Sequence, residues 1–353
     1  MEEQNPYVFS VRQMVEFICR RGDLTGGFGG SVQRALEGTR VHQKLQKSRS
    51  GAYQSEVALK TREILSDGLI LQVEGRADGV EEFPEKDPPA CIEEIKSTYA
   101  PADRLGFSFQ PTHRGQLLCY GYILCKTKGW ERVLLRLTYY QMETDQEYSF
   151  DEVWDFPALE TFFQETLSEY AKWIRWQEDH RQKRTESLGT LEFPFPAYRE
   201  GQRTMAAYIY KTIEKGGGLF LQAPTGIGKT ISALFPALKA MGQGLTGRIF
   251  YLTAKTATAL SAQEALGRLK SQRPRLLSIV LTAKDKICPF PDKRCAPGEC
   301  PYAKGHYDRV MDAVYAAIGK ETSLYRQKVL EYAERFRVCP FELELDISIP
   351  RLR

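Results

Sequence analysis

One eight-residue segment constrains the fold of this 353-residue chain more than any other. It reads Ala-Pro-Thr-Gly-Ile-Gly-Lys-Thr at residues 223–230, after an apolar run at 218–222 and before a helical pattern that starts at Ile231. A strand, a glycine loop ending in Lys-Thr and a helix form the context of a phosphate-binding loop. Glycines let backbone N–H groups close around phosphates, and the helix N-terminus adds a favourable dipole. The segment therefore predicts an α/β domain with a nucleotide site.

Within this loop we expect Lys229 to reach the β- and γ-phosphates and the Thr230 hydroxyl to ligate Mg²⁺. Thr225, Gly226 and Gly228 complete the phosphate cradle. The first position is Ala223 rather than the glycine of the general pattern. This variant resembles the loop of helicases more than that of kinases or small GTPases, which implies that the nucleotide is ATP.

The segments on either side of the loop agree with that resemblance. Upstream, Arg199 and Gln202 lie in a stretch that resembles the adenine-reading element of superfamily 2 helicases, which implies contacts with ATP. Downstream, an apolar strand beginning at residue 248 ends in Thr253, Lys255 and Thr256. It resembles the element that grips the single-stranded DNA backbone, and basic and hydroxyl groups suit phosphate contacts.

Four cysteines follow the loop, at positions 288, 295, 300 and 339. Four thiolates can hold zinc or a [4Fe–4S] cluster. The pattern Cys-x₆-Cys-x₄-Cys-x₃₈-Cys has no Cys-x-x-Cys pair, which favours iron–sulfur over zinc, although zinc and four unconnected thiols remain alternatives. Its place after the phosphate loop resembles the DinG/XPD group of iron–sulfur superfamily 2 helicases. That resemblance implies cluster ligands, which are Cys288, Cys295, Cys300 and Cys339.

Paired acidic residues occur earlier, on what we predict to be two neighbouring strands. Asp78 ends the first, and Glu94 and Lys96 lie on the second, after a turn-rich stretch. Residues two apart on a strand face the same way, so Glu94 and Lys96 share a face. Two carboxylates can hold Mg²⁺ or Mn²⁺ to generate a nucleophilic water, and a lysine can stabilise the charge that develops. This set predicts metal-dependent phosphodiester hydrolysis.

Three further residues extend this set into an ordered series. His42 precedes it, and Gln116 and Tyr120 follow it four residues apart, on one face of an expected helix. The series resembles the RecB-like branch of the PD-(D/E)xK nuclease superfamily over residues 10–145. The resemblance implies a mixed sheet with flanking helices, metal binding by the two carboxylates and catalysis by the lysine. It also implies that His42, Gln116 and Tyr120 position substrate or metal.

The chain divides where an amphipathic helical pattern over residues 158–184 gives way to a charged run and then to glycine and prolines. We therefore predict a nuclease-like domain at 1–182, a linker at 183–193 and an incomplete RecA-like lobe at 194–353. The cysteine insertion occupies about residues 284–341. The overall fold class is α/β.

Composition adds weak constraints. The formal net charge is +4, which permits binding of DNA without requiring it. No apolar run approaches the ~18 residues of a membrane span, and the first ten residues do not resemble a signal peptide. We expect a cytoplasmic protein without a membrane partner, in which cysteines outside the four-cysteine pattern are buried or incidental thiols. Those are Cys19, Cys91, Cys119 and Cys125.

Together these patterns predict the N-terminal part of a 5′→3′ iron–sulfur DNA helicase fused to a nuclease domain, in DNA repair. The expected partner is DNA that is single-stranded or has single-stranded tails. The acidic ATPase motif expected after the cysteines does not appear up to Arg353, so we expect a missing helicase half, in cis or in trans, and poor ATP turnover. Two alternatives remain: a non-catalytic single-stranded-DNA-binding remnant that binds ATP without turnover, and a zinc-binding nucleotide switch.

Overall fold

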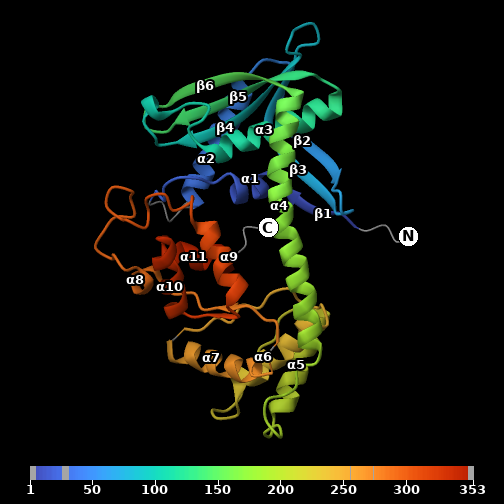
Figure 1. The fold of residues 1–353 in the computed structure, drawn as a ribbon, viewed down its shortest axis with the longest axis vertical. Helices are drawn as coiled ribbons and strands as arrows, with labels where there is room; N and C mark the ends of the chain where they lie inside the picture. Colours follow the sequence, from blue (N-terminus) through green and yellow to red (C-terminus); the bar gives the residue numbers. More distant parts are fainter. Residues whose placement is uncertain (1–4, 26–31, 255, 273, 349–353) are drawn as a thin grey trace. The chain divides into compact units, whose positions relative to one another are not determined.

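The computed structural model describes residues 5–25, 32–254, 256–272 and 274–348, except the side chains of residues 32–35, 256 and 257. It divides into two compact units (Figure 1). The first unit combines Met1–Lys172 with Ile279–Gly319 and Tyr325–Arg353, and the second combines Trp173–Ser278 with Lys320–Leu324. The mixed α/β architecture with a mixed sheet and flanking helices agrees with the α/β prediction.

A six-stranded mixed sheet forms the centre of the first unit. Its order is β1-β3-β4-β5-β6, and β2 also pairs with β3. The β1–β3 and β4–β5 pairs are parallel, and the β2–β3, β3–β4 and β5–β6 pairs are antiparallel. The strands are β1 (Tyr7–Ser10), β2 (Tyr53–Ile64), β3 (Ile70–Glu82), β4 (Ala90–Thr98), β5 (Arg132–Gln141) and β6 (Gln146–Asp155).

Helices cover this sheet, and its interior strand β4 is buried on both faces. β4 is buried from Ala90 to Ile95, as expected for an interior strand packed on both sides. Behind it, α3 is buried almost all round between Leu117 and Cys125. The ring of Tyr122 on α3 stacks on Phe163 at a centroid distance of 4.1 Å, which fixes the start of α4. The helices are α1 (Val11–Ile18), α2 (Val32–Ser48), the 3₁₀ turn η1 (Ala102–Arg104), α3 (Pro111–Lys128) and α4 (Phe156–Gly189).

The segment that carries the four cysteines belongs mainly to the same unit as the sheet. It is helical, and several of its valines and alanines are buried, including Val310, Val314 and Val329. Its helices are α8 (Lys284–Ile287), α9 (Val310–Lys320), α10 (Arg326–Phe336) and α11 (Pro340–Ser348). This segment was predicted to be an insertion in the RecA-like lobe, and no contact between it and the sheet domain was predicted.

The second unit contains the end of α4 and the phosphate loop. Leu188 on α4 packs with Leu234 and Leu238 on α6 in one apolar cluster. The predicted linker begins inside α4, where the Arg181–Glu178 and Lys183–Asp179 ion pairs keep the charged run helical. Independent folding on either side of residues 183–193 stays a prediction. The elements are α5 (Gln202–Lys215), α6 (Lys229–Gly242), α7 (Thr256–Lys270), β7 (Ser278–Ile279) and β8 (Ser323–Leu324).

The strands predicted at residues 218–222 and 248–252 do not form, so this part of the prediction was wrong. A strand requires a neighbouring strand that accepts and donates its backbone hydrogen bonds. Among the described residues no strand pairs with either segment. Their apolar side chains are accordingly open to solvent, with Phe220 fully exposed and Leu252 89% exposed. No helix in the described ranges has the length and apolar character needed to cross a bilayer.

Candidate functional site

The two acidic residues of the first unit meet where β3 and β4 separate. Gly79 on β3 pairs with Glu93 on β4, so Asp78 and Glu94 follow at the opening between the strands. There the Oδ2 atom of Asp78 accepts a hydrogen bond of 2.6 Å from the backbone N–H of Ile95. The Asp78 side chain therefore occupies the position that a strand backbone would otherwise fill. This fixes its carboxylate beside that of Glu94.

The other predicted residues join these two carboxylates through side-chain contacts. Lys96 donates a hydrogen bond to Glu94 and lies 3.4 Å from the Oε1 atom of Gln116. Gln116 in turn donates to the Tyr120 hydroxyl at 2.9 Å, so these two residues share one face of α3. From α2, the Nδ1 atom of His42 lies 3.2 Å from Asp78. The structure thus brings all six residues together, while their catalytic roles stay predictions.

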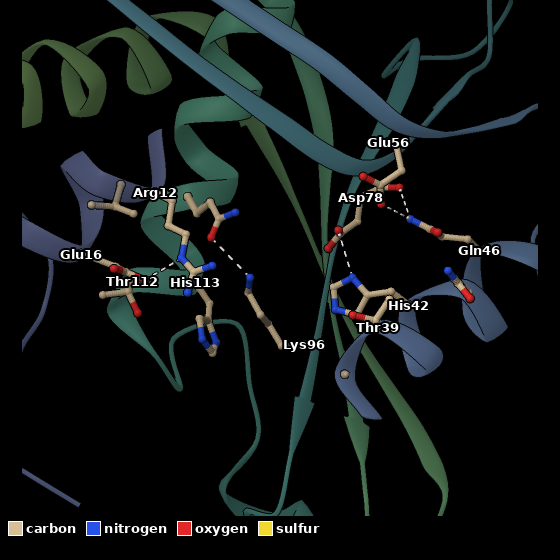
Figure 2. Close-up of a pocket in the computed structure, with 14 residues that line it drawn as sticks. Arg12, Glu16, Thr39, His42, Gln46, Glu56, Asp78, Lys96, Thr112 and His113 are labelled. Atoms are coloured by element: carbon tan, nitrogen blue, oxygen red, sulfur yellow. Dashed lines mark hydrogen bonds and ion pairs between the residues drawn. The ribbon is translucent and has the colours of Figure 1, made fainter. Parts of the chain in front are cut away.

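A cavity of about 760 Å³ opens onto this group (Figure 2). Figure 2 shows His42 and Asp78 on one side and Lys96 facing Arg12 and His113 on the other. The lining comes from α1, α2, α3 and from strands β2, β3 and β4. The lining residues are Arg12, Val15, Glu16, Gly38, Thr39, His42, Gln43, Gln46, Glu56, Asp78, Lys96, Thr112, His113 and Gln116.

Burial sets the protonation of the groups around the cavity. Glu94 is 1% exposed, and burial, with the nearby charge of Asp78, raises its pKa to about 7 despite Lys96. Burial lowers the pKa of His42, but the hydrogen bond and negative charge of Asp78 outweigh it and raise that pKa. His113 bonds the Tyr139 hydroxyl at 3.0 Å, and its burial lowers its pKa to about 3. Near neutral pH, His113 is therefore an uncharged imidazole.

The site fits a divalent cation that keeps several water ligands. The Oε2 atom of Glu94 is buried and has no hydrogen-bond partner, so it is available to a cation. The Asp78 carboxylate lies beside it, and its side chain is 14% exposed. No group of three or more His, Cys, Asp or Glu side chains able to hold a metal occurs among the described residues. Mg²⁺ commonly binds through one or two carboxylates and completes its shell with water.

Sequence reasoning missed several residues that line this cavity. Arg12 and Glu16 come from α1, far from any recognised motif, and they form an ion pair with an N–O distance of 2.7 Å. His113 precedes Gln116 by almost one helical turn on α3. Their positions depend on how α1 packs on α3, for which the sequence carries no short-range signal.

In the second unit, the phosphate loop has the geometry its glycines predict. Gly226 and Gly228 have φ values of +84° and +82°, a region that side-chain-bearing residues rarely adopt. α6 begins immediately afterwards, at Lys229. The Lys229 ammonium donates to the carbonyls of Ala223 and Pro224 at 3.1 and 3.0 Å, so it points back over the loop. This is where phosphate groups would lie on a helix N-terminus.

Two of the predicted ATP contacts support this loop directly. Arg199 donates to the Gly226 carbonyl at 2.5 Å. The Gln202 amide donates to the Ile227 carbonyl at 2.6 Å and accepts from the Arg199 backbone N–H at 2.7 Å. Thr230 lies at the start of α6, where Tyr251 contacts its hydroxyl at 3.5 Å, and Thr225 is exposed in the turn.

The predicted DNA contacts are less well defined by the structure. Thr253 is partly buried in the segment before α7. Lys255 lies outside the described residues, and Thr256 is described only as the first residue of α7. DNA binding by these three residues stays a prediction.

The four cysteines of the predicted cluster gather around one region without forming a ligand set. Cys300 and Cys339 pack in the same buried apolar cluster. Lys284 hydrogen-bonds Cys295, and this bond, with the nearby charges of Cys339 and Cys288, raises the pKa of the lysine. The Cys339 backbone N–H donates to the Nδ1 atom of His306 at 3.2 Å.

The remaining cysteines lie at the end of α1 and on β4 and α3 of the first unit. Cys91, Cys119 and Cys125 are buried, as predicted, and burial raises the pKa of each thiol. Cys19 is partly buried and faces α3, where it would lie 3.1 Å from a Cβ placed on Gly115. Burial raises its pKa to about 11.

Comparisons with known proteins give limited support. No family model matches the chain. The probable ATP-dependent helicase MJ0942 of Methanocaldococcus jannaschii is 47% identical over 47 residues, which is 13% of this chain and 7% of that protein. The chain thus spans only a small part of this relative, and the match supports a helicase link and nothing finer. The crystal structure of SSO0001 covers 47% of this chain and 77% of its own, at 16% identity and a TM-score of 0.30.

Proposed function

We propose that this chain processes DNA, with a metal-dependent nuclease site in its first unit and an ATP-binding helicase loop in its second. The nuclease proposal rests on one observation. Asp78 and Lys96 line a single cavity, Glu94 is buried beside Lys96, and one buried Glu94 oxygen has no protein partner. That arrangement suits divalent-metal hydrolysis of a phosphodiester better than a structural ion pair, which would satisfy both carboxylate oxygens.

Each side chain has a defined part in this proposal. A bound Mg²⁺ or Mn²⁺ would supply a nucleophilic water and neutralise charge on the phosphate. Asp78 and Glu94 hold the cation, and the Ile95 N–H fixes the orientation of the Asp78 carboxylate. Lys96, held by Glu94 and Gln116, orients the water or stabilises the developing negative charge. His42, Gln116 and Tyr120 keep the surrounding geometry.

The helicase part of the proposal rests on the phosphate loop and on the short match to a probable ATP-dependent helicase. Lys229 and the Gly226–Gly228 turn bind the phosphates of ATP, and Thr230 ligates Mg²⁺. Arg199 and Gln202 hold the loop in its binding conformation. DNA with single-stranded regions is the proposed substrate, and a 5′→3′ polarity and a role in repair follow only from the family resemblance.

The four-cysteine segment is proposed to hold a [4Fe–4S] cluster. The chemistry of the donor set supports this, because three of the thiols act on one Lys284 ammonium and the fourth packs beside Cys339. Anaerobic purification should give a brown protein that contains iron and sulfide. A colourless protein that contains zinc would overturn the cluster in favour of a structural zinc site.

Cleavage of labelled single-stranded DNA in Mn²⁺ or Mg²⁺ tests the nuclease proposal. Lys96→Ala should lower the rate at saturating Mn²⁺ at least 100-fold, and Asp78→Asn should lower the rate and also weaken Mn²⁺ binding. Lys128→Ala is the matched control, since Lys128 pairs with Glu82 at the surface, outside the cavity. If neither the wild type nor Lys96→Ala cleaves DNA, the nuclease assignment is wrong, and a non-catalytic DNA-binding protein is favoured instead.

Nucleotide binding is tested separately, with a fluorescent ATP analogue. Lys229→Ala should reduce affinity at least tenfold, because an ammonium at the loop contributes a charge-assisted contact to the phosphates. Lys211→Ala, on the exposed face of α5, should bind as wild type does. Identical affinities for all three proteins would contradict the nucleotide site.

A further inference from the structure

α1 forms one wall of the cavity and is fixed at its N-terminus by the sheet. It starts directly after β1, where Ser10 and Gln13 form a reciprocal capping box with bonds of 2.7 and 3.1 Å. One face of the helix, with Val11, Met14 and Val15, is buried in the core. Another face directs Arg12 and Glu16 into the cavity (Figure 2).

Arg12 is placed to meet a polyanion at this wall. Its side chain is 74% exposed and forms an ion pair with Glu16 on the same helix. Arg12 lines the same cavity as Asp78 and Lys96, so it lies close to the proposed metal site. Exposed ion pairs within a helix are weak and screened by salt. A phosphate, which a guanidinium can contact with two parallel hydrogen bonds, can therefore replace Glu16 as the partner of Arg12.

The C-terminal end of α1 continues into a segment, residues 20–24, that is joined to the four-cysteine segment. The Arg20 guanidinium lies 3.1 Å from both Asp346 carboxylate oxygens, and these two side chains are 14% and 6% exposed. Arg20 also lies over the Tyr307 ring, 4.3 Å from its centroid. This is a largely buried ion pair between residues 326 positions apart.

Backbone contacts extend this junction along residues 22–24. Gly22 accepts a hydrogen bond from the Tyr307 N–H at 2.9 Å, and the Leu24 N–H donates to Ala303 at 2.8 Å. The Leu24 side chain packs with Cys300 and Cys339. Two acidic side chains close the junction from either side, with Asp23 accepting from the Gly305 N–H at 2.7 Å and Asp308 accepting from the Gly22 N–H at 2.9 Å.

We propose that Arg12 binds the phosphate backbone of the nucleic acid in this cavity, and that Arg20 is a positioning residue that holds α1, through Asp346, in the orientation this contact needs. This proposal rests on the proposed nuclease site. It assigns α1 as the wall of the cavity along which the nucleic-acid substrate lies. It also makes the four-cysteine segment a structural support of that wall. Glu16 keeps Arg12 directed into the cavity until phosphate arrives.

DNA binding without divalent metal tests the Arg12 contact independently of cleavage. Fluorescence anisotropy with a labelled single-stranded oligonucleotide in EDTA should show at least tenfold weaker binding for Arg12→Ala. The slope of log affinity against log salt should fall by about 0.7, as expected for one lost phosphate contact to a single strand. Arg12→Lys should recover part of the affinity, and Arg62→Ala, an exposed change on β2, should have no effect. Wild-type binding by Arg12→Ala would overturn the assignment.

Hydrogen exchange and steady-state kinetics test the positioning role of Arg20. Arg20→Ala and the near-isosteric Asp346→Asn should both speed amide exchange in residues 11–19 and raise KM while leaving kcat within about twofold. Arg335→Ala, on the exposed face of α10, should leave both unchanged. Unchanged exchange in α1 in both Arg20→Ala and Asp346→Asn would refute the positioning role. If neither the wild type nor any variant cleaves DNA, the nuclease proposal fails. The DNA-binding and hydrogen-exchange results still test the roles of Arg12 and Arg20.

Discussion

The Nδ1 atom of His42 lies 3.2 Å from the Oδ1 atom of Asp78, which links α2 to β3 at one side of the cavity. The other Asp78 oxygen is bound by the Ile95 N–H at 2.6 Å. One carboxylate therefore joins a helix and two strands. A change in its charge should therefore affect His42, the proposed metal site and the packing of α2 together.

Replacing Asp78 by Asn should lower the pKa of His42. Burial alone lowers that pKa, and the bond and charge of Asp78 are what raise it above 6.5. In the wild type, the full stabilisation of the metal-free fold by this interaction is present below about pH 6.5. The stabilisation is lost as the pH rises through the raised pKa of His42. An NMR titration of the His42 ring in both proteins measures the shift. An unchanged His42 pKa in Asp78→Asn would contradict the pairing.

Replacing Glu94 by Gln should stabilise the metal-free protein increasingly between pH 4.5 and about pH 7. The buried Glu94 carboxyl has its pKa raised from 4.5 to about 7, so the folded state binds its proton more tightly than the unfolded state. Wild-type stability therefore falls as the pH rises through this interval, by on the order of 1–3 kcal/mol. Urea denaturation at pH 5 and pH 8 measures the difference, with the exposed change Glu85→Gln as control.

Mn²⁺ affinity should depend on pH for the same reason. A cation binds the deprotonated Glu94, so binding below its pKa of about 7 must release a proton. The affinity should fall about tenfold for each pH unit below that value. Calorimetry in buffers of different ionisation enthalpy measures the proton release directly. Mn²⁺ binding at pH 6 without release of a proton would show that Glu94 does not hold the metal.

Adding a methyl group at Gly75 should disturb Tyr120 beside the proposed nuclease site. A Cβ at this position would lie 2.4 Å from the Cε1 atom of Tyr120, whose side chain is 3% exposed. Overpacking of this kind costs roughly 1–3 kcal/mol. We expect Gly75→Ala to lower the free energy of unfolding by that amount and to slow DNA cleavage. Gly51→Ala, where a Cβ meets no atom within 4 Å, is the control.

Removing the Gln202 side chain should weaken ATP and GTP binding by the same factor. The Gln202 amide is bound to the Ile227 carbonyl and to the Arg199 N–H, so it supports the phosphate loop. Gln202→Ala should therefore loosen a contact that both nucleotides use. Titration of the two nucleotides against wild type and variant measures this. A loss confined to ATP would instead favour the base-reading role that the family resemblance implies.

Local patterns in the sequence predicted much of the candidate site. The alternation of strand residues placed Glu94 and Lys96 together, and the four-residue spacing placed Gln116 and Tyr120 on one helix face. A helix was predicted from Ile231, directly after the glycine loop, and α6 begins two residues earlier, at Lys229. Each of these relationships depends on neighbours within a few residues, which is why a single sequence can show them.

Long-range relationships were out of reach for the same reason. Nothing near Arg20 in the sequence indicates Asp346, and nothing near Arg12 indicates the cavity. The strands expected at 218–222 and 248–252 failed because an apolar run specifies burial but does not supply a pairing partner. Their exposed side chains show how far local apolarity can mislead.

The junction between residues 20–24 and the four-cysteine segment also has a consequence for folding. Synthesis proceeds from the N-terminus, so the strands of the sheet can pair long before residues 303–346 exist. The segment that follows α1 cannot be fixed until those residues have been synthesised. Its contacts are distant in sequence, because Arg20 pairs with Asp346, 326 positions away, and Leu24 bonds Ala303. Contacts of such sequence separation are slow to form. A growing chain would therefore hold a paired sheet with an unfinished cavity, which would become competent only as the four-cysteine segment closes against α1.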